Sequence, residues 1–397
     1  MLDDCASRSL LQAVRKARDP DKSVFDHRRG DFDLGRAGPV IEAAQHAAKH
    51  GRGAALLRGL PRDGVDESKF ELLTWAIGLH IGVARPRGKA SQYIAPVRDI
   101  GTVYRSAGGR GYSSNADLDF HADSADVVLL ACYSQTQSGG VSLCTSSVTA
   151  HQQLQAERPD LAEVLHRPFW FSRQMEQAPD ETAVYPNPVY DEAGGLLCSK
   201  WNRNRIQIAQ QIEGVPPLTS QRRAAMDKLD EVLRRPELMH AMFLQPGDVQ
   251  ILNSHVTLHS RTGFVDFDEP LRKRLLFRLW LAHPIRHACP RVGCRLIARS
   301  RRGQCAAGLS GKPMTRRGRS TNGGRRASWE CTCEKAAPAQ CAGAVASLSH
   351  LIRDALRRLI KQHAAFFLAP WSGPPQLLPQ INAALHCGTL FYRISPA

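Results

Sequence analysis

The tripeptide His121-Ala122-Asp123 carries two side chains that together can bind a metal ion. It comes shortly before the apolar run 127–134, which has the length and composition of a buried strand. Because side chains alternate along an extended segment, residues 121 and 123 are expected on one face. This is the only His-x-Asp/Glu in the chain, although a match of this kind is expected by chance among 15 histidines. The alternative interpretation is a surface histidine followed by an aspartate that caps the strand.

A second histidine would complete a site of two histidines and one carboxylate. That donor set leaves adjacent coordination positions open on ferrous iron, for a cosubstrate and oxygen. A second β-type segment, 253–261, contains both His255 and His259. Residues i and i+4 share one face of a strand, so the spacing alone does not distinguish the two histidines.

The closing β-type segment, 274–284, places two arginines on one face. In an extended strand, Arg274 and Arg278 point the same way as Leu276 and Trp280. A guanidinium is the natural receptor for a carboxylate, because its planar fork donates two parallel hydrogen bonds. The segment therefore predicts a carboxylate-binding pair, and the alternative is an outer strand with two solvated arginines.

Four motifs follow one another in the chain. They are Asn115-Ala-Asp-Leu-Asp-Phe-His121-Ala-Asp123-Ser124, Ser138-Gly-Gly-Val-Ser142, Pro246-Gly-Asp-Val-Gln-Ile-Leu-Asn253-Ser-His-Val-Thr-Leu-His259-Ser-Arg261, and Arg274-Leu-Leu-Phe-Arg278. In this order they resemble the taurine dioxygenase (TauD/TfdA-like) family, over about residues 35–285. The resemblance implies a non-haem iron(II)- and 2-oxoglutarate-dependent dioxygenase on a double-stranded β-helix, also called a jelly roll.

The resemblance also implies the metal ligands. His121, Asp123 and His259 would hold the iron, since the family pattern Asn/Ser-x-x-x-x-His favours His259 over His255. Asn115 corresponds to a polar, substrate-binding residue at the mouth of the site.

The cosubstrate residues are implied in the same way. Arg274 would pair with the distal carboxylate of 2-oxoglutarate, assisted by the hydroxyl of Ser142. Arg278 corresponds to a family arginine near the metal that contacts the cosubstrate or an anionic substrate. Arg272 competes with Arg274, because the family often places its carboxylate-binding arginine slightly closer to the last histidine.

The implied chemistry uses Fe(II), 2-oxoglutarate and O2. It would convert 2-oxoglutarate into succinate and CO2 while hydroxylating or oxidatively cleaving a small organic substrate. Related halogenating enzymes lack the carboxylate ligand, so Asp123 favours hydroxylation or cleavage. Arg278 and the basic segment around Arg205 permit an anionic substrate, and a neutral substrate is equally compatible with the sequence.

Short β-type runs and a few helices must position these residues. Strands are predicted over 54–61, 127–134, 141–147, 168–173, 249–254 and from Arg274, and helices over 38–49, 68–79, 150–165 and 220–234. A Pro/Asn-rich turn is predicted near 185–188, and a solvated basic loop over 200–205, with a substrate lid as the alternative for that loop. The pattern is typical of an α+β fold, mainly β with helical cover.

Charge and cysteine divide the chain. Of the formal net charge of +16, residues 1–285 contribute little, with 35 basic and 34 acidic residues, while residues 286–397 have 18 basic and 3 acidic. Cysteine follows the same division, with four before residue 286 and seven after it. The sequence therefore predicts an N-terminal extension over 1–34, a dioxygenase domain over 35–285, and a basic, Cys-rich, disordered tail over 286–397.

The tail suggests a second class of function, a non-catalytic jelly-roll protein that binds nucleic acid through its arginines. The nearly neutral charge of residues 1–285 makes nucleic acid an unlikely partner for the core. No apolar run is long enough for a membrane-spanning helix. The first twenty residues lack the features of a secretory signal, which predicts a cytoplasmic protein. The sequence does not indicate an oligomeric state.

Overall fold

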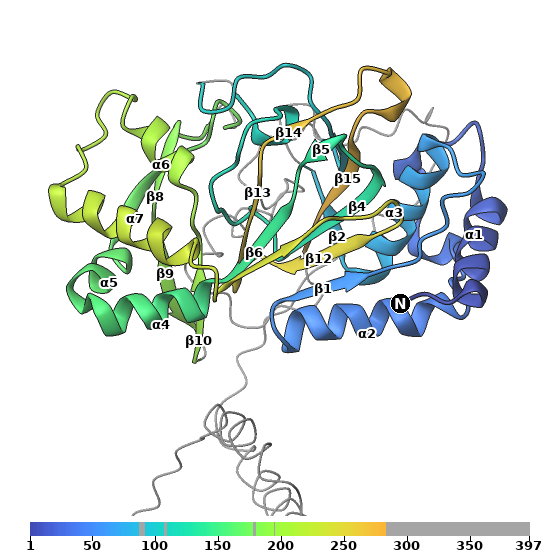
Figure 1. The fold of residues 1–397 in the computed structure, drawn as a ribbon, viewed down its shortest axis with the longest axis horizontal. Coiled ribbons are helices and arrows are strands. Elements are labelled where there is room, and N and C mark those ends of the chain that lie inside the picture. Colours follow the sequence, from blue (N-terminus) through green and yellow to red (C-terminus); the bar gives the residue numbers. More distant parts are fainter. Residues whose placement is uncertain (87–91, 107–108, 178–179, 194, 283–397) are drawn as a thin grey trace, which may run out of the picture. The chain divides into compact units, whose positions relative to one another are not determined.

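The computed structural model describes residues 1–282, apart from 87–91, 107–108, 178–179 and 194. The basic tail over 286–397 therefore lies outside the described residues. Two antiparallel sheets meet at the centre of the described part, with helices on both outer sides (Figure 1). The predicted α+β class, antiparallel sheets with helical cover, is confirmed.

The larger sheet has the strand order β1-β12-β4-β15-β2, and β3 also pairs with β15. Its strands are β1 Ala54–Leu57, β2 Val83–Arg85, β3 Ile94–Val97, β4 Val127–Ser134, β12 Val249–Asn253 and β15 Leu275–Ala282. Each pair is antiparallel. The predicted strands over 127–134 and 249–254 are confirmed within a residue. The strand predicted over 274–284 is observed over Leu275–Ala282, and the residues after it lie outside the described part.

Three helices cover the outer face of this sheet. They are α1 Asp4–Ala17, α2 Ala37–His50 and α3 Glu67–Ile81, with the short 3-10 turns η1 Val24–Asp26 and η2 Arg29–Asp31 between α1 and α2. Their apolar side chains join the outward residues of β15, such as Phe277 and Leu279, in one buried cluster. Leu10 of α1 is fully buried in it, so the segment predicted as an N-terminal extension shares this core.

The smaller sheet has the order β11-β6-β13. Its strands are β6 Ser142–Ser146, β11 Met239–Met242 and β13 Thr257–Arg261. Leu276 and Trp280, on the inward face of β15, share a second buried cluster with Cys144 of β6. The alternation predicted for this closing segment is thus confirmed, and the face that carries Arg278 points between the two sheets.

The Gly-Gly pair of the second motif forms the turn that precedes β6. β5 Ser138–Gly139 pairs with β14 Phe264–Val265, and Gly139 and Gly140 have φ of 72° and 71°. A Cβ on Gly139 would lie 2.2 Å from the carbonyl oxygen of Gly263. Glycine is required here because the backbones pack closely in a left-handed conformation, and Ser142 follows directly after this turn.

The second helical layer covers the smaller sheet. It contains α4 Ser147–Glu157, α5 Pro159–Leu165, α6 Arg203–Ala209, α7 Ser220–Leu233, the hairpin of β7 Pro168–Ser172 with β8 Val184–Pro188, and the hairpin of β9 Tyr190–Ala193 with β10 Leu196–Ser199. The remaining short turns are η3 Gly111–Ser113 and η4 Pro270–Arg272.

Two sequence predictions in this layer are wrong. The single helix over 150–165 is two helices, because Pro159 has no N–H to continue α4 and instead begins α5. The turn near 185–188 is strand β8, which pairs only with β7 and so tolerates proline at its outer edge. Tyr185 and Asn187 of β8 are buried, which explains why the segment is extended.

Candidate active site

Backbone pairing brings His121 and His259 together. The N–H of His121 donates to the carbonyl of His259 at 2.9 Å, and the N–H of His259 donates back at 3.0 Å. Residues paired in this way across antiparallel strands point to the same side, and the two ring centroids lie 4.4 Å apart. β13 therefore carries His259 directly opposite the His-x-Asp segment.

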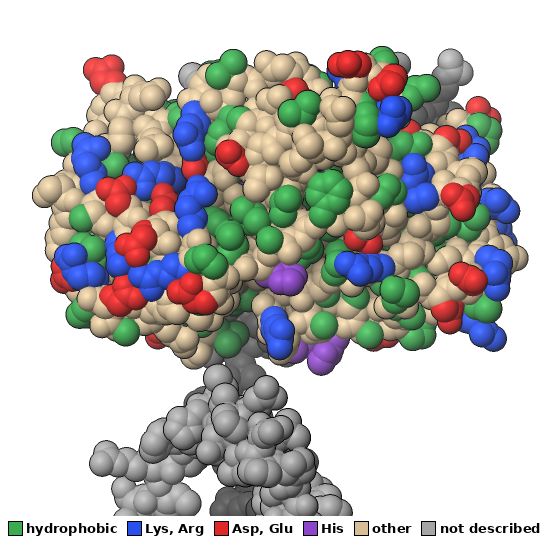
Figure 2. All heavy atoms as spheres, in the orientation of Figure 1, with side chains coloured by type: hydrophobic (Ala, Val, Ile, Leu, Met, Phe, Trp, Pro, Cys, Tyr) green, Lys and Arg blue, Asp and Glu red, His purple; other side chains and the backbone are tan. Residues whose placement is uncertain are grey.

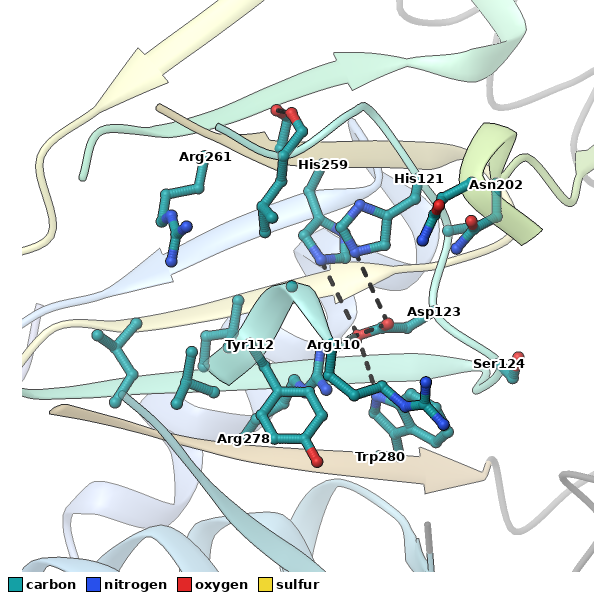
Figure 3. Close-up of a pocket in the computed structure, with 18 of the residues that line it drawn as sticks. Arg110, Tyr112, His121, Asp123, Ser124, Asn202, His259, Arg261, Arg278 and Trp280 are labelled. Atoms are coloured by element: carbon teal, nitrogen blue, oxygen red, sulfur yellow. Dashed lines mark hydrogen bonds and ion pairs between the residues drawn. The ribbon is translucent and has the colours of Figure 1, made fainter. Parts of the chain in front are cut away.

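Asp123 completes a compact group of donors. Its Oδ1 lies 3.9 Å from Nε2 of His121, and its Oδ2 lies 3.9 Å from Nε2 of His259. One ligand atom from each residue lies within 4.8 Å of the other two (Figure 3). Among the residues that the structure describes, no other cluster of three His, Cys, Asp or Glu side chains has this geometry.

His255 lies outside the group. Its Nε2 is 3.1 Å from Oδ1 of Asp126, and the residue precedes β13 in a turn, so the alternation of a strand does not apply to it. The geometry groups His259, rather than His255, with His121 and Asp123.

Both imidazoles are set up as neutral ligands. Nδ1 of His121 lies 2.9 Å from the carbonyl of Asp119, which accepts a hydrogen bond from the Nδ1–H group. The proton therefore stays on Nδ1, and the lone pair of Nε2 is free on the side of Asp123. Burial lowers the pKa of His121, and burial together with the neighbouring His121 lowers the pKa of His259 to about 3. Neutral imidazole is the form that binds a metal ion.

Asp123 is held as a carboxylate. Its burial favours the neutral acid, but the charge of Arg278 and the hydrogen bond from Trp280 act against burial, and the pKa of Asp123 lies well below the ordinary value. Nη1 of Arg278 donates to Oδ2 at 3.2 Å, and the indole N–H of Trp280 donates to the same oxygen at 2.9 Å. Two neutral imidazoles and one ionised carboxylate form the donor set of a non-haem iron(II) site.

A cavity of about 440 Å³ opens onto this group. Its wall contains Ser142, Arg274 and Arg278, the three residues predicted to bind the cosubstrate. Arg274 and Arg278 are only 7% and 8% exposed, so the alternative of two solvated arginines on an outer strand is wrong. Arg272 is exposed, pairs with Glu269 at 3.2 Å and does not line the cavity.

Arg274 is a buried cation whose guanidinium forms no salt bridge with a described residue, although Asp266 accepts its backbone N–H at 2.8 Å. Its Nη1 has no hydrogen-bond partner among the described residues. Burial lowers its pKa to about 10, so the guanidinium is still charged at neutral pH. Ser142, on the same wall, donates its hydroxyl to Oε1 of Gln250 at 3.1 Å.

The structure does not bring Asn115 to the cavity. The residue is exposed, its carbonyl accepts the N–H of Phe264 at 3.0 Å, and it is not among the residues that line the cavity. This geometry gives the predicted role at the mouth of the site no support. Asn202 and Asn204, at the start of α6, line the cavity instead.

The segment 200–205 is not a solvated loop. Lys200 and Trp201 are buried, and Asn202 caps α6 by accepting the N–H of Arg205 at 3.0 Å. Asn202 also forms a β-bridge with His121. This pairing holds the segment against the metal-site strand, where Arg205 lines the cavity.

A partly buried ion pair on the cavity wall was not anticipated from the sequence. Arg110, just before η3, donates to Oε1 of Glu176 at 3.1 Å and to the carbonyl of Gln174 at 2.6 Å. Gln174 and Met175 have positive φ values of 54° and 60°, which are uncommon for residues other than glycine. The run of Arg, Tyr and Gly over 104–112 was the only signal available, because Glu176 comes 66 residues later.

Comparisons with known proteins agree with this geometry. Residues 17–280 match the family described as Taurine catabolism dioxygenase TauD, TfdA family. The chain is 28% identical over 285 residues to FR-33289 synthase of Streptomyces rubellomurinus (strain ATCC 31215), an alignment that covers 71% of this chain and 84% of that protein.

Solved structures share the fold. One is asparagine oxygenase in complex with Fe(II), 2S,3S-3-hydroxyasparagine and succinate, with a TM-score of 0.54, 18% identity, and coverage of 70% of this chain and 92% of that one. Another is non-heme iron oxygenase OrfP with Fe, succinate and (3S)-hydroxy-L-Arg, with a TM-score of 0.53, 14% identity, and coverage of 78% and 98%. From its match over residues 17–280, the chain belongs to the TauD/TfdA family of iron(II)- and 2-oxoglutarate-dependent dioxygenases.

Proposed function

We propose that this dioxygenase hydroxylates, or oxidatively cleaves, a small organic substrate on a double-stranded β-helix, with release of succinate and CO2. In the hydroxylation, one atom of O2 enters a substrate C–H bond and the other enters succinate. The observation that carries the proposal is the group of His121, Asp123 and His259, which faces a cavity that is also lined by the buried Arg274, whose Nη1 has no hydrogen-bond partner among the described residues.

His121, Asp123 and His259 would hold the iron. Bound there, iron(II) would supply the redox chemistry that couples the decarboxylation of 2-oxoglutarate to the oxidation of the substrate. The protein's part is to orient the ligands. The carbonyl of Asp119 fixes the ring of His121, and Arg278 and Trp280 fix the carboxylate of Asp123.

Arg274 is assigned to the distal carboxylate of 2-oxoglutarate, with Ser142 beside it on the cavity wall. A carboxylate bound there would give the buried Nη1 of Arg274 its missing partner. Arg278 is already engaged by Asp123, which supports an orienting role in addition to the contact with cosubstrate or substrate that the resemblance implies.

The test is an anaerobic titration of metal-free protein with ferrous iron and then 2-oxoglutarate, following the weak visible charge-transfer band of the chelate. We expect the band in the wild-type protein and its loss in His259→Ala. The matched control is His255→Ala, four residues away and outside the ligand group, which should retain the band. A band that survives in His259→Ala, or no iron binding by the wild type, would contradict the proposal.

The nucleic-acid alternative rests on the charge of residues 286–397, which lie outside the described residues. Over residues 1–285 basic and acidic residues nearly balance. Figure 2 shows the two signs interspersed on the face that it displays. The described part of the chain thus offers this alternative no support.

A further inference from the structure

The cavity wall carries several arginines, most of which already have partners. The five are Arg110, Arg205, Arg261, Arg274 and Arg278. Arg110 pairs with Glu176 and Arg278 with Asp123. Arg261 is held by backbone carbonyls, including that of Ser114 at 2.9 Å. These three guanidinium groups are therefore used within the protein.

Arg205 differs from these three. Its backbone N–H bonds to Asn202, while its guanidinium has no hydrogen-bond or carboxylate partner within the described ranges, and its side chain is only partly exposed. Arg274 is the other lining arginine whose guanidinium forms no salt bridge with a described residue, and the proposed function assigns it to 2-oxoglutarate. Because 2-oxoglutarate is assigned to Arg274, the unpaired guanidinium of Arg205 needs a different ligand.

The two guanidinium groups have different neighbours: the charge of Arg274 acts on Arg261, and the charge of Arg205 acts on Lys200. Arg274 directly precedes β15, which then passes Arg278 and reaches Trp280, beside Asp123. Arg205 lies in the first turn of α6, next to Asn202. In Figure 3, Arg261 lies on one side of the two histidines, and Asn202 and Ser124 lie on the other. An anion at Arg205 would not occupy the position of one at Arg274.

A second cation lies behind the Arg205 end. Lys200 is 4% exposed, and its Nζ donates to the Oγ of Ser124 at 2.8 Å without any carboxylate in salt-bridge range among the described residues. Ser124 lines the cavity. A hydroxyl that accepts from an ammonium keeps its own proton to donate and is polarised by the charge, so Ser124 can present a strengthened donor to the cavity.

A buried ammonium without an anion is unfavourable. Burial, and then the nearby Arg205, lower the pKa of Lys200 to about 7. The charge of the Arg205 guanidinium is therefore left without a partner among the described residues, and a bound anion would compensate it.

We infer that Arg205 and the hydroxyl of Ser124, supported from behind by Lys200, bind an oxyanion group of the substrate. The inference rests on the proposed function and specifies its substrate class. The substrate is a small organic molecule with a carboxylate, phosphate or related oxyanion group at one end and the oxidised C–H bond nearer to His121, Asp123 and His259. The distal carboxylate of 2-oxoglutarate stays at the Arg274 end.

The test uses the full chain with Fe(II) and 2-oxoglutarate under anaerobic conditions, titrated by calorimetry with inorganic phosphate and separately with acetate. The two anions distinguish a dianionic from a monoanionic group. We expect at least one to bind while the charge-transfer band persists, and Arg205→Gln to weaken that binding at least tenfold. Ser124→Ala should weaken it severalfold, which provides a second variant if Arg205→Gln does not fold.

The matched control is Arg223→Gln, which removes the same charge from an exposed position on α7 and should leave anion binding unchanged. The inference is overturned if neither anion binds, if binding only displaces 2-oxoglutarate, or if Arg205→Gln binds like the wild type. Absence of the band would instead contradict the proposed function. Phosphate calorimetry on metal-free Arg205→Gln and Arg274→Gln would then still test the anion subsite.

Discussion

The two ends of the cavity are built from different kinds of structure. The Arg274 end is formed by strands β6 and β13 and the start of β15, whose residues are buried on both faces. The Arg205 end is formed by the seven-residue helix α6 and by the loop that carries Ser124. Under the proposed function, the invariant cosubstrate is received by the sheet, and the substrate by loop-borne residues that can change without disturbing the core.

Asp123 lies between the two ends of the cavity, so its replacement should impair both of them. In Asp123→Asn, we expect iron affinity to fall by more than about 100-fold, since loss of an outer-shell partner alone costs up to about that much. The free energy of unfolding should fall by about 3 kcal/mol, because buried Arg278 loses its counter-charge. Iron titration and thermal unfolding measure the two effects. Asp126→Asn, which affects the partner of His255, is the control and should bind iron normally.

Arg274→Gln should affect only the Arg274 end of the cavity. We expect affinity for 2-oxoglutarate to fall by about 100-fold, the cost of losing a charge-assisted hydrogen-bonded pair. The affinity is read from the charge-transfer band, and phosphate binding should be unchanged. The control is Arg272→Gln, at an exposed position two residues earlier. Equal losses in the two variants would refute the assignment of Arg274.

Lys200 allows the Arg205 end of the cavity to be tested through the free energy of unfolding. Its pKa is lowered from 10.5 to about 7 by burial and by Arg205. Between these pH values the unfolded chain binds the proton and the folded protein does not, so the wild-type free energy of unfolding should rise with pH across this window. Below about pH 7 both states are protonated, and the contribution is a constant penalty.

Replacing Lys200 with methionine should remove this pH dependence. We expect Lys200→Met to lack a rise on the order of 2 kcal/mol between pH 7 and 10, measured by urea unfolding at each pH. Lys16→Met, at an exposed position on α1, should keep the wild-type slope. Parallel pH profiles for wild type and Lys200→Met would show that Lys200 is not held in an unfavourable charged state.

The smallest expected effect concerns Glu176. In Glu176→Gln, Arg110 loses its carboxylate partner and becomes a further free guanidinium on the cavity wall. We expect phosphate to bind about threefold more tightly, the scale of a partly exposed ion pair, with the 2-oxoglutarate band unchanged. Phosphate binding is measured by calorimetry, and the control is Glu163→Gln, at an exposed position on α5. Unchanged phosphate binding would place Arg110 outside the anion's reach.

Local patterns predicted much of the central sheet and the site. The run 127–134 is β4 residue for residue, and the alternation of the closing segment correctly faces Arg278 inward. These predictions succeeded because a strand buried on one or both faces must show its period in the sequence. Predictions were weaker in the second helical layer, where Pro159 begins a helix and proline-containing β8 forms a strand.

The sequence by itself determined the family, the His-x-Asp pair and the arginine-bearing strand, because each depends on residues close together in the chain. Only the tertiary structure decided the partners of those residues. Asp123 is paired with Arg278, 155 residues later, and Lys200 is buried against Ser124, 76 residues earlier. Which segments meet depends on packing of the whole core, and the charge state of a buried group depends on the neighbours that this packing supplies.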